Sequence, residues 1–252
     1  NNVVYFQNSK LDVNLGYINN DRSEFEDSDI PVLHMVLNTF NYNVKYYLPQ
    51  LGKLETIVGV QGMNQSNKNF GEEYLIPDAI TNDFGVFGTG IYAWENNSLQ
   101  AGLRYDYRNL NTEENGIQGE EGYFQPIDKS YNSFNASLGY KKDFTEDFTF
   151  RLNMASGFKA PTLAELLSNR YEIGNVNLNT EQNLQTDLDL EYKISHFEFG
   201  VSAFYNHIND YIYASPTNLE IEGYQVYNYI QNNANLYGGE IVVHFHPHPL
   251  DW

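Results

Sequence analysis

The stretch LQAGLRYDYR at residues 99–108 shows the pattern that recurs along the chain. Its odd-numbered residues are apolar or aromatic, and its even-numbered residues are polar, charged or glycine. Because successive side chains of a β-strand point to opposite faces, this alternation predicts a strand with one apolar and one polar face. The same period of two is found at 40–47, 134–141, 148–155 and 184–192.

Applied to the whole chain, the alternation predicts an almost all-strand protein. Eleven strands are expected at 1–6, 10–20, 31–48, 53–64, 83–95, 98–109, 131–142, 147–158, 182–193, 197–209 and 224–246. Most of them contain 11 residues or more, about twice the usual strand length of soluble proteins. The connections between them are alternately short and long, which in an up-and-down sheet places tight turns at one end and long loops at the other.

Transmembrane β-barrels have this asymmetry, and tilted strands of about 9–11 residues span the hydrocarbon layer. We therefore expect an all-β fold, an antiparallel up-and-down transmembrane β-barrel to which this chain contributes about 11 strands. Aromatic residues such as Trp94, Tyr140 and Tyr192 fall near the short turns, where rings sit at the headgroup level. The alternative is a soluble sandwich or barrel, in which the same apolar faces would pack into a core.

Composition excludes several classes of function. The formal net charge of −19 argues against a nucleic-acid partner, which needs clustered Lys and Arg. The absence of cysteine removes disulfides, thiolate nucleophiles and cysteine-ligated metals. No catalytic fingerprint is present, so no catalytic residue, enzyme activity or cofactor is expected. The long loops carry most of the acidic residues, which either attract divalent cations and lipopolysaccharide or simply keep the loops solvated.

The connection after residue 158 contains the most distinctive motif. Pro161 and Gly174 interrupt the strand pattern there, and TLAELL at 162–167 predicts a short helical turn with Thr162 as its cap and Glu165 three residues on. The run ASGFKAPTLAEL at 155–166, followed by GNVNL at 174–178 and by Glu181, resembles the paired FRAP and NPNL boxes of TonB-dependent outer-membrane receptors. Further segments that resemble this family are NYNVKYYLP at 41–49, AGLRYDYR at 101–108, FYNHINDYI at 204–212 and GGE at 238–240.

The resemblance implies a bacterial outer-membrane receptor that captures a scarce ligand and is energised by the TonB complex through a plug domain. It implies a barrel of the 22-stranded plugged type, so that residues 1–252 would be a partial barrel domain without the plug and the final strands. The expected partners are therefore the TonB complex, outer-membrane lipid and lipopolysaccharide, and a small-molecule ligand. A passive porin, an adhesin-type barrel and a soluble β-rich binding module remain alternatives.

Two departures from the family boxes bear on the ligand. Lys159 stands where the box usually has Arg, and Val176 replaces the Pro of NPNL. The haem receptors of the family have a histidine between the boxes, and residues 162–174 contain none, which disfavours haem. A ferric siderophore, cobalamin or another metal chelate remains possible, as does an oligosaccharide or a peptide.

Two groups of residues are candidates for contact with the ligand. The first belongs to the long connection and comprises Phe158, Lys159, Arg170, Tyr171, Asn175 and Asn177. The second is charged and is expected on the lumen-facing side of the strands, where it either forms structural ion pairs or lines the ligand path: Arg104, Arg108, Lys141, Arg151, Asp106, Asp187, Asp189 and Glu191. His244, His246 and His248 could share one face of a strand, but the neighbouring prolines favour a turn over a metal site.

Overall fold

The computed structural model describes residues 2–118, 122–168 and 171–246. They form one curved sheet of twelve strands, in which neighbours in sequence pair antiparallel except around the short strand β9. The strands are β1 (Asn2–Tyr5), β2 (Lys10–Glu24), β3 (Leu33–Tyr47), β4 (Leu54–Asn69), β5 (Ala79–Trp94), β6 (Asn97–Thr112), β7 (Asp128–Asp143), β8 (Phe148–Lys159), β9 (Glu172–Ile173), β10 (Glu181–Ile194), β11 (Phe197–Ile221) and β12 (Tyr224–Phe245). One helix, α1 (Leu163–Leu167), lies between β8 and β9.

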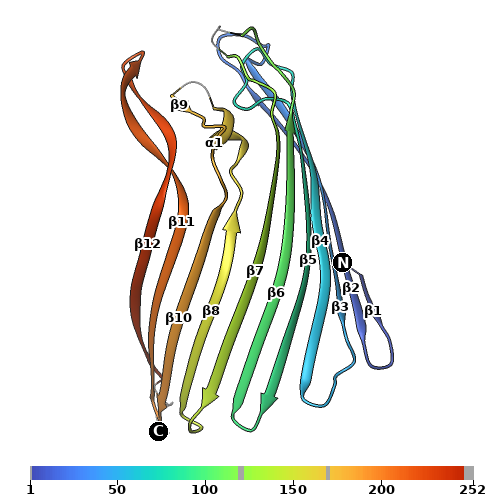
Figure 1. Ribbon diagram of the computed structural model, residues 1–252, viewed down its shortest axis with the longest axis vertical. Coiled ribbons are helices and arrows are strands. Elements are labelled where there is room, and N and C mark those ends of the chain that lie inside the picture. The colour runs from blue at the N-terminus through green and yellow to red at the C-terminus, as the bar shows by residue number, and fades with distance from the viewer. Residues whose placement is uncertain (1, 119–121, 169–170, 247–252) are drawn as a thin grey trace, which may run out of the picture.

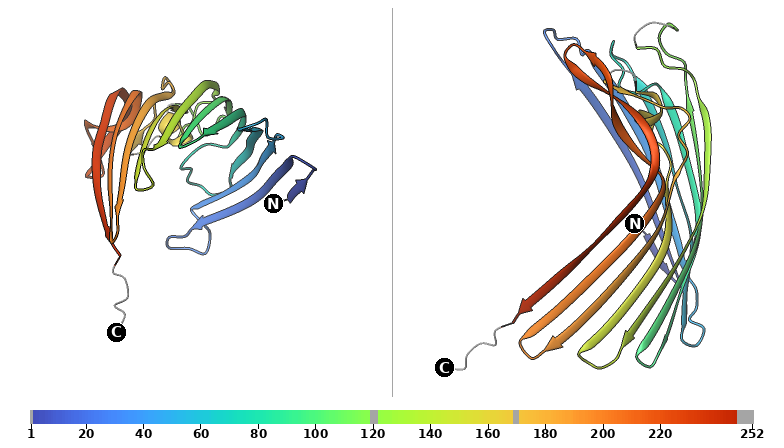
Figure 2. Two further views of the ribbon diagram at one scale, coloured as in Figure 1. Left: turned by 90° about the horizontal axis from the view of Figure 1, so that it is seen from below. Right: turned by 60° about the vertical axis from the view of Figure 1, so that its left-hand side comes forward.

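The sheet is bent into an open trough, as expected for part of a barrel wall (Figures 1 and 2). Tight turns join the strands at one end, and the long loops gather at the other (Figure 1). All eleven strands that the alternation predicts are present, and the all-β, antiparallel, up-and-down architecture is confirmed. The described residues do not close the barrel, because the sheet order begins at β1 and ends at β12 with β9. No helix in the described part of the chain is long and apolar enough to cross a membrane.

The two faces of the sheet differ as the sequence pattern predicts. On β6, Leu103 is 56% exposed and shares its face with Phe134 of β7, which is 67% exposed. The opposite face carries Arg104, Asp106 and, further along, the buried Leu110, which packs against α1. Since α1 lies inside the trough (Figure 2), the polar face is the concave one and the exposed apolar face is convex.

Aromatic side chains cluster at the end of the sheet that carries the tight turns. Tyr92 and Trp94 have ring centroids 5.5 Å apart, and Phe144 stacks on Phe148 at 5.3 Å. Phe197 and Phe245 are 5.0 Å apart across β11 and β12. Such a band of rings at one edge of an apolar surface is typical of a membrane interface.

The sequence prediction fails at residues 210–223, where a long loop was expected. β11 instead continues to Ile221 and turns back through Glu222 and Gly223, whose φ angles are +54° and +83°. Two register shifts, one after Ile208 and one after Pro216, absorb the residues that interrupt the alternation. Because β-bulges let a ladder resume beyond such residues, Pro216 and the polar residues near it do not end the strand.

Candidate functional site

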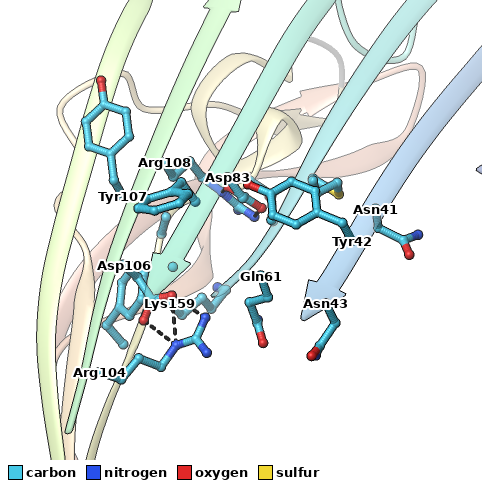
Figure 3. A pocket seen from close by; sticks show the side chains of 17 residues that line it. Asn41, Tyr42, Asn43, Gln61, Asp83, Arg104, Asp106, Tyr107, Arg108 and Lys159 are labelled. Atoms are coloured by element: carbon cyan, nitrogen blue, oxygen red, sulfur yellow. Dashed lines mark hydrogen bonds and ion pairs between the residues drawn. The ribbon is translucent and has the colours of Figure 1, made fainter. Parts of the chain in front are cut away.

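A hollow of about 600 Å³ lies on the concave face of the wall (Figure 3). Strands β3 to β6 form its floor, and the end of β8 with the start of the following connection forms one side. Its polar lining comprises Asn41, Asn43, Gln61, Asp83, Arg104, Asp106, Arg108, Lys159 and Thr162. Three cationic side chains therefore meet two carboxylates and three amides in one concavity.

The two guanidinium groups on the floor are held by carboxylates. Arg108 forms a two-pronged pair with Asp83 of the adjacent strand, with Nε and Nη2 each 2.6 Å from a carboxylate oxygen. Arg104 pairs with Asp106, two residues along β6, and lies 5.6 Å from the ring centroid of Phe87. Bidentate pairing fixes the planar fork of arginine, so these cations are oriented before any ligand arrives.

Gly85 lies beneath the Arg104 and Asp106 pair. A Cβ at this position would lie 2.5 Å from Arg104 Nη2 and 2.5 Å from Asp106 Oδ1. The glycine therefore lets both side chains lie flat against the sheet, which leaves the space above the floor open.

The part of the floor that β3 and β4 form presents uncharged amides. Asn41 and Asn43 of β3 and Gln61 of β4 line it (Figure 3). Asn43 Oδ1 is buried and has no hydrogen-bond partner among the described residues. A buried acceptor without a partner costs free energy, so this oxygen would gain from a hydrogen bond, but only after neighbouring side chains move to expose it.

Lys159 stands at the edge of the hollow but is held by two carboxylates. Its Nζ is 2.5 Å from Glu165 Oε1 and 3.2 Å from Glu181 Oε1. Glu165 completes the predicted capping box, since its Oε2 accepts the Thr162 N–H at 2.8 Å while Thr162 Oγ1 accepts the Glu165 N–H at 3.2 Å. The geometry thus gives Lys159 a structural role in fastening α1 to β8 and β10.

The second box packs around α1. Gly174 N–H donates to Ser168 O at 2.6 Å, and Asn175 N–H donates to Glu165 O at 2.9 Å. The side chains of Leu166, Leu167 and Leu178 join Leu110, Phe124 and Ile212 in the main buried cluster of the described residues. The two boxes therefore pack against each other as one folded unit.

Tyr229 of β12 holds the same unit from the other side. Its hydroxyl donates to a carboxylate oxygen of Glu172 in β9. Tyr229 itself lies in the part of β12 beyond the residues that are expected to span the membrane. Burial and this hydrogen bond to a carboxylate raise the pKa of Tyr229 to about 12, so the hydroxyl keeps its proton and remains a donor.

The residues predicted from the long connection are not all brought together. Phe158 and Lys159 lie at the edge of the hollow. The Tyr171 hydroxyl donates to Glu222 and its ring packs on Tyr224, at the tip of the β11–β12 hairpin. Asn175 Nδ2 donates to Tyr229 O at 3.2 Å, and its Oδ1 accepts the N–H of the exposed Asn177. Arg170 lies outside the described residues.

The charged residues predicted for the lumen share the concave face by register. Only some of their pairings cross between strands: Arg151 Nη1 and Nη2 each lie 3.0 Å from Glu191, whereas Lys141 pairs with Asp143 on its own strand. Asp187 and Asp189 accept hydrogen bonds from Gln185 and Ser202. Whether any of these residues contacts a ligand stays a prediction.

Sequence reasoning missed Asp83 and the amides Asn41, Asn43 and Gln61. Asp83 pairs with Arg108 because Asp83↔Arg108 is a rung of the β5–β6 ladder, 25 residues apart in sequence. The two-residue turn between β5 and β6 could have fixed this register from the sequence.

In the histidine series, the ring centroids of His244 and His246 are 6.2 Å apart, and His248 lies outside the described residues. Among the described residues, no group of three His, Cys, Asp or Glu side chains could hold a metal ion.

Comparisons with known proteins agree with this architecture. A family model described as TonB dependent receptor-like, beta-barrel, matches residues 1–252. Among solved structures, the copper transporter OprC is 14% identical with a TM-score of 0.77 and the match covers 95% of this chain. The FrpB iron transporter from Neisseria meningitidis (F3-3 variant) is 18% identical with a TM-score of 0.69 over 95%. The siderophore receptor PirA from Pseudomonas aeruginosa is 15% identical with a TM-score of 0.57 over 94%.

The matched part is 41% of the OprC chain, 38% of the FrpB chain and 50% of the PirA chain, so this chain spans half or less of these proteins. At these identities the likeness to solved structures shows the fold, while the family model covers every residue. Such proteins are outer-membrane transporters and receptors of Gram-negative bacteria, not enzymes. The chain belongs to the TonB-dependent receptor-like β-barrel family.

Proposed function

We propose that this chain is the barrel wall of a receptor that imports a scarce metal chelate, such as a ferric siderophore, across the outer membrane. The family match over the whole chain carries the proposal. Solved structures with the same fold are described as iron and copper transporters and as a siderophore receptor, which supports a metal-containing ligand. The TonB complex, acting through a plug domain, would supply the energy.

The hollow on the concave face supports a chelate as the ligand. It combines oriented guanidinium groups with amide donors and acceptors, and these match the carboxylate, hydroxamate or phenolate oxygens that surround a chelated metal. Because both arginines are already paired with carboxylates, the hollow does not present a strong positive field. We therefore expect hydrogen bonding to contribute more to selection than net charge.

Energised uptake is the first test. Cells that express the full-length receptor should accumulate a radiolabelled ferric chelate, and a protonophore or removal of TonB should reduce accumulation to the level of cells without the receptor. Surface binding of the chelate should persist, because binding does not need the proton-motive force. Uptake that is unaffected by both treatments would indicate a passive porin, and uptake of a copper complex alone would assign a different metal.

The hollow itself is tested by an isosteric change on its floor. Gln61→Leu should weaken binding of the transported chelate by about tenfold, because the loss of one hydrogen bond to a polar ligand costs about 1.5 kcal/mol. Gln65→Leu is the matched control, since Gln65 lies on the same face of β4, outside the hollow, and bonds to Thr39. Equal affinity of the two variants in equilibrium binding would remove the hollow from the ligand site.

The outer-membrane partners are proposed on the same basis. The exposed apolar convex face would contact lipid, and lipopolysaccharide would surround the loop end of the wall. The acidic loops would meet divalent cations that bridge lipopolysaccharide phosphates.

A further inference from the structure

The pairing between β7 and β8 is much shorter than that of the neighbouring strands. It comprises seven residue pairs, from Ser137↔Ala155 to Asp143↔Thr149. β6 and β7 form fifteen pairs, and β8 and β10 form twelve. Both β7 and β8 lie wholly within the described residues, so residues 128–136 of β7 have no partner in β8. Figure 1 shows β8 ending well below the top of β7.

Beyond the last residue pair, a hydrogen bond to a side chain replaces the backbone pairing between β7 and β8. Ser156 Oγ accepts the Ala136 N–H at 2.9 Å and lies 3.4 Å from Ala136 O. The backbone groups of Ala136 therefore face β8, and those of Phe134 and Asn132 face the same way because hydrogen-bonding direction alternates along an antiparallel strand. Ala136 pairs with Leu103 on its other side, in the middle of the exposed apolar row of β6. The strands thus begin to separate at membrane depth, where unpaired backbone groups are costly.

The segment after β8 spans the separation between the strands on the concave side of the wall (Figure 1). We call residues 160–168 and 171–180 the wedge. On the β6–β7 side, Leu166 and Leu167 of the wedge pack with Leu110, and Lys129 Nζ donates to Val176 O at 2.6 Å. Tyr131 of β7 is only 8% exposed, and its hydroxyl has no hydrogen-bond partner among the described residues.

The wedge is also attached to the other side of the separation. Asn179 N–H donates to Gln231 Oε1 at 2.8 Å, and Gln231 Nε2 donates back to Asn179 O at 2.9 Å. Ile212 of β11 packs in the same cluster as Leu166, and its N–H donates to Glu181. Side-chain packing and loop hydrogen bonds therefore link β7 to β11 and β12 above the level at which the ladder ends.

We propose that the upper part of the wall between β7 and β8 is a lateral seam closed by the wedge, so that displacing the wedge admits water into the wall at the depth of the outer leaflet. The seam is a property of the wall and does not depend on the ligand or on TonB. The buried Tyr131 hydroxyl without a partner marks a polar position that water would occupy when the seam opens.

Hydrogen exchange on the unaltered full-length receptor tests the seam directly. The amides of Asn132 and Phe134 should exchange at least tenfold faster than those of Tyr131 and Ser133, which face β6 in the same strand. This internal comparison cancels differences in solvent access along β7. Equal protection of the two sets would contradict the proposal.

Thiol labelling tests the role of the wedge. This chain has no cysteine, so Ser156→Cys places a single thiol of the wall at the seam, and Met154→Cys places one in the paired region just below. With the wedge intact, both thiols should react slowly with a membrane-impermeant maleimide. When a Gly-Ser linker replaces residues 162–178, the reaction at Ser156→Cys should become at least tenfold faster, whereas that at Met154→Cys should not change. No increase at Ser156→Cys, or an equal increase at both positions, would overturn the proposal.

Discussion

Gly174→Ala is expected to detach the second box from α1 and to destabilise the wedge by on the order of 3 kcal/mol. A Cβ at this position would lie 2.4 Å from Leu167 N and 2.5 Å from Leu166 C. Both are backbone atoms, so the clash cannot be relieved by rotating a side chain, and the chain at 174 must move away from the helix. The Gly174 N–H bond to Ser168 O would be lost with it.

The measurement is the local opening free energy of α1 from hydrogen exchange at Leu166 and Ser168. Gly88→Ala is the matched control, because the nearest heavy atom to a Cβ there is 3.8 Å away. We expect the control to exchange like the unaltered protein. Unchanged protection of α1 in Gly174→Ala would show that the close approach at Gly174 does not limit the wedge.

Glu181→Ala is expected to cost about 1–3 kcal/mol, because it leaves the buried Ile212 N–H without an acceptor and removes one of the two carboxylates that hold Lys159. Glu181 is 9% exposed, and its Oε1 accepts both Lys159 Nζ at 3.2 Å and the buried Ile212 N–H at 2.9 Å. Removing the carboxylate leaves the Ile212 N–H buried and unsatisfied and weakens the attachment of Lys159 to β10.

Glu181→Gln separates the two contributions. The amide oxygen can still accept the Ile212 N–H, while the charge that holds Lys159 is lost, so we expect less than half of the alanine effect. Urea unfolding of the refolded barrel in lipid vesicles would measure both variants. Equal destabilisation by glutamine and alanine would mean that the ion pair with Lys159, and not the bond to Ile212, accounts for the effect.

The fold could be predicted from the sequence largely because the two faces of the sheet differ in polarity. In β6, the alternation from Leu99 to Arg108 continues without a break, since each side chain lies on either the exposed apolar face or the concave polar face. The helix at 163–167 was also predictable, because Thr162 and Glu165 form a local capping box. Where local sequence alone decides the structure, the prediction is confirmed.

The prediction fails where pairing between distant residues decides the outcome. Residues 210–221 resemble a loop, yet they continue β11 because β12 offers a partner strand across two bulges. The pair between Arg108 and Asp83 depends on ladder register, which periodicity does not give. In the same way, the wedge joins residues of β6, β11 and the loop at 124, and no pattern within one segment shows that they share a cluster.

The central claim is that the apolar face of this wall contacts lipid and the polar face lines the lumen. Spin labels at successive single cysteines from residue 99 to 108 of the full-length receptor in lipid vesicles test it most directly. The account predicts that collisions with oxygen peak at the odd positions, such as Leu103, and that collisions with a water-soluble nickel complex peak at the even positions, such as Arg104. The reverse phase, or nickel access at every position, would contradict it.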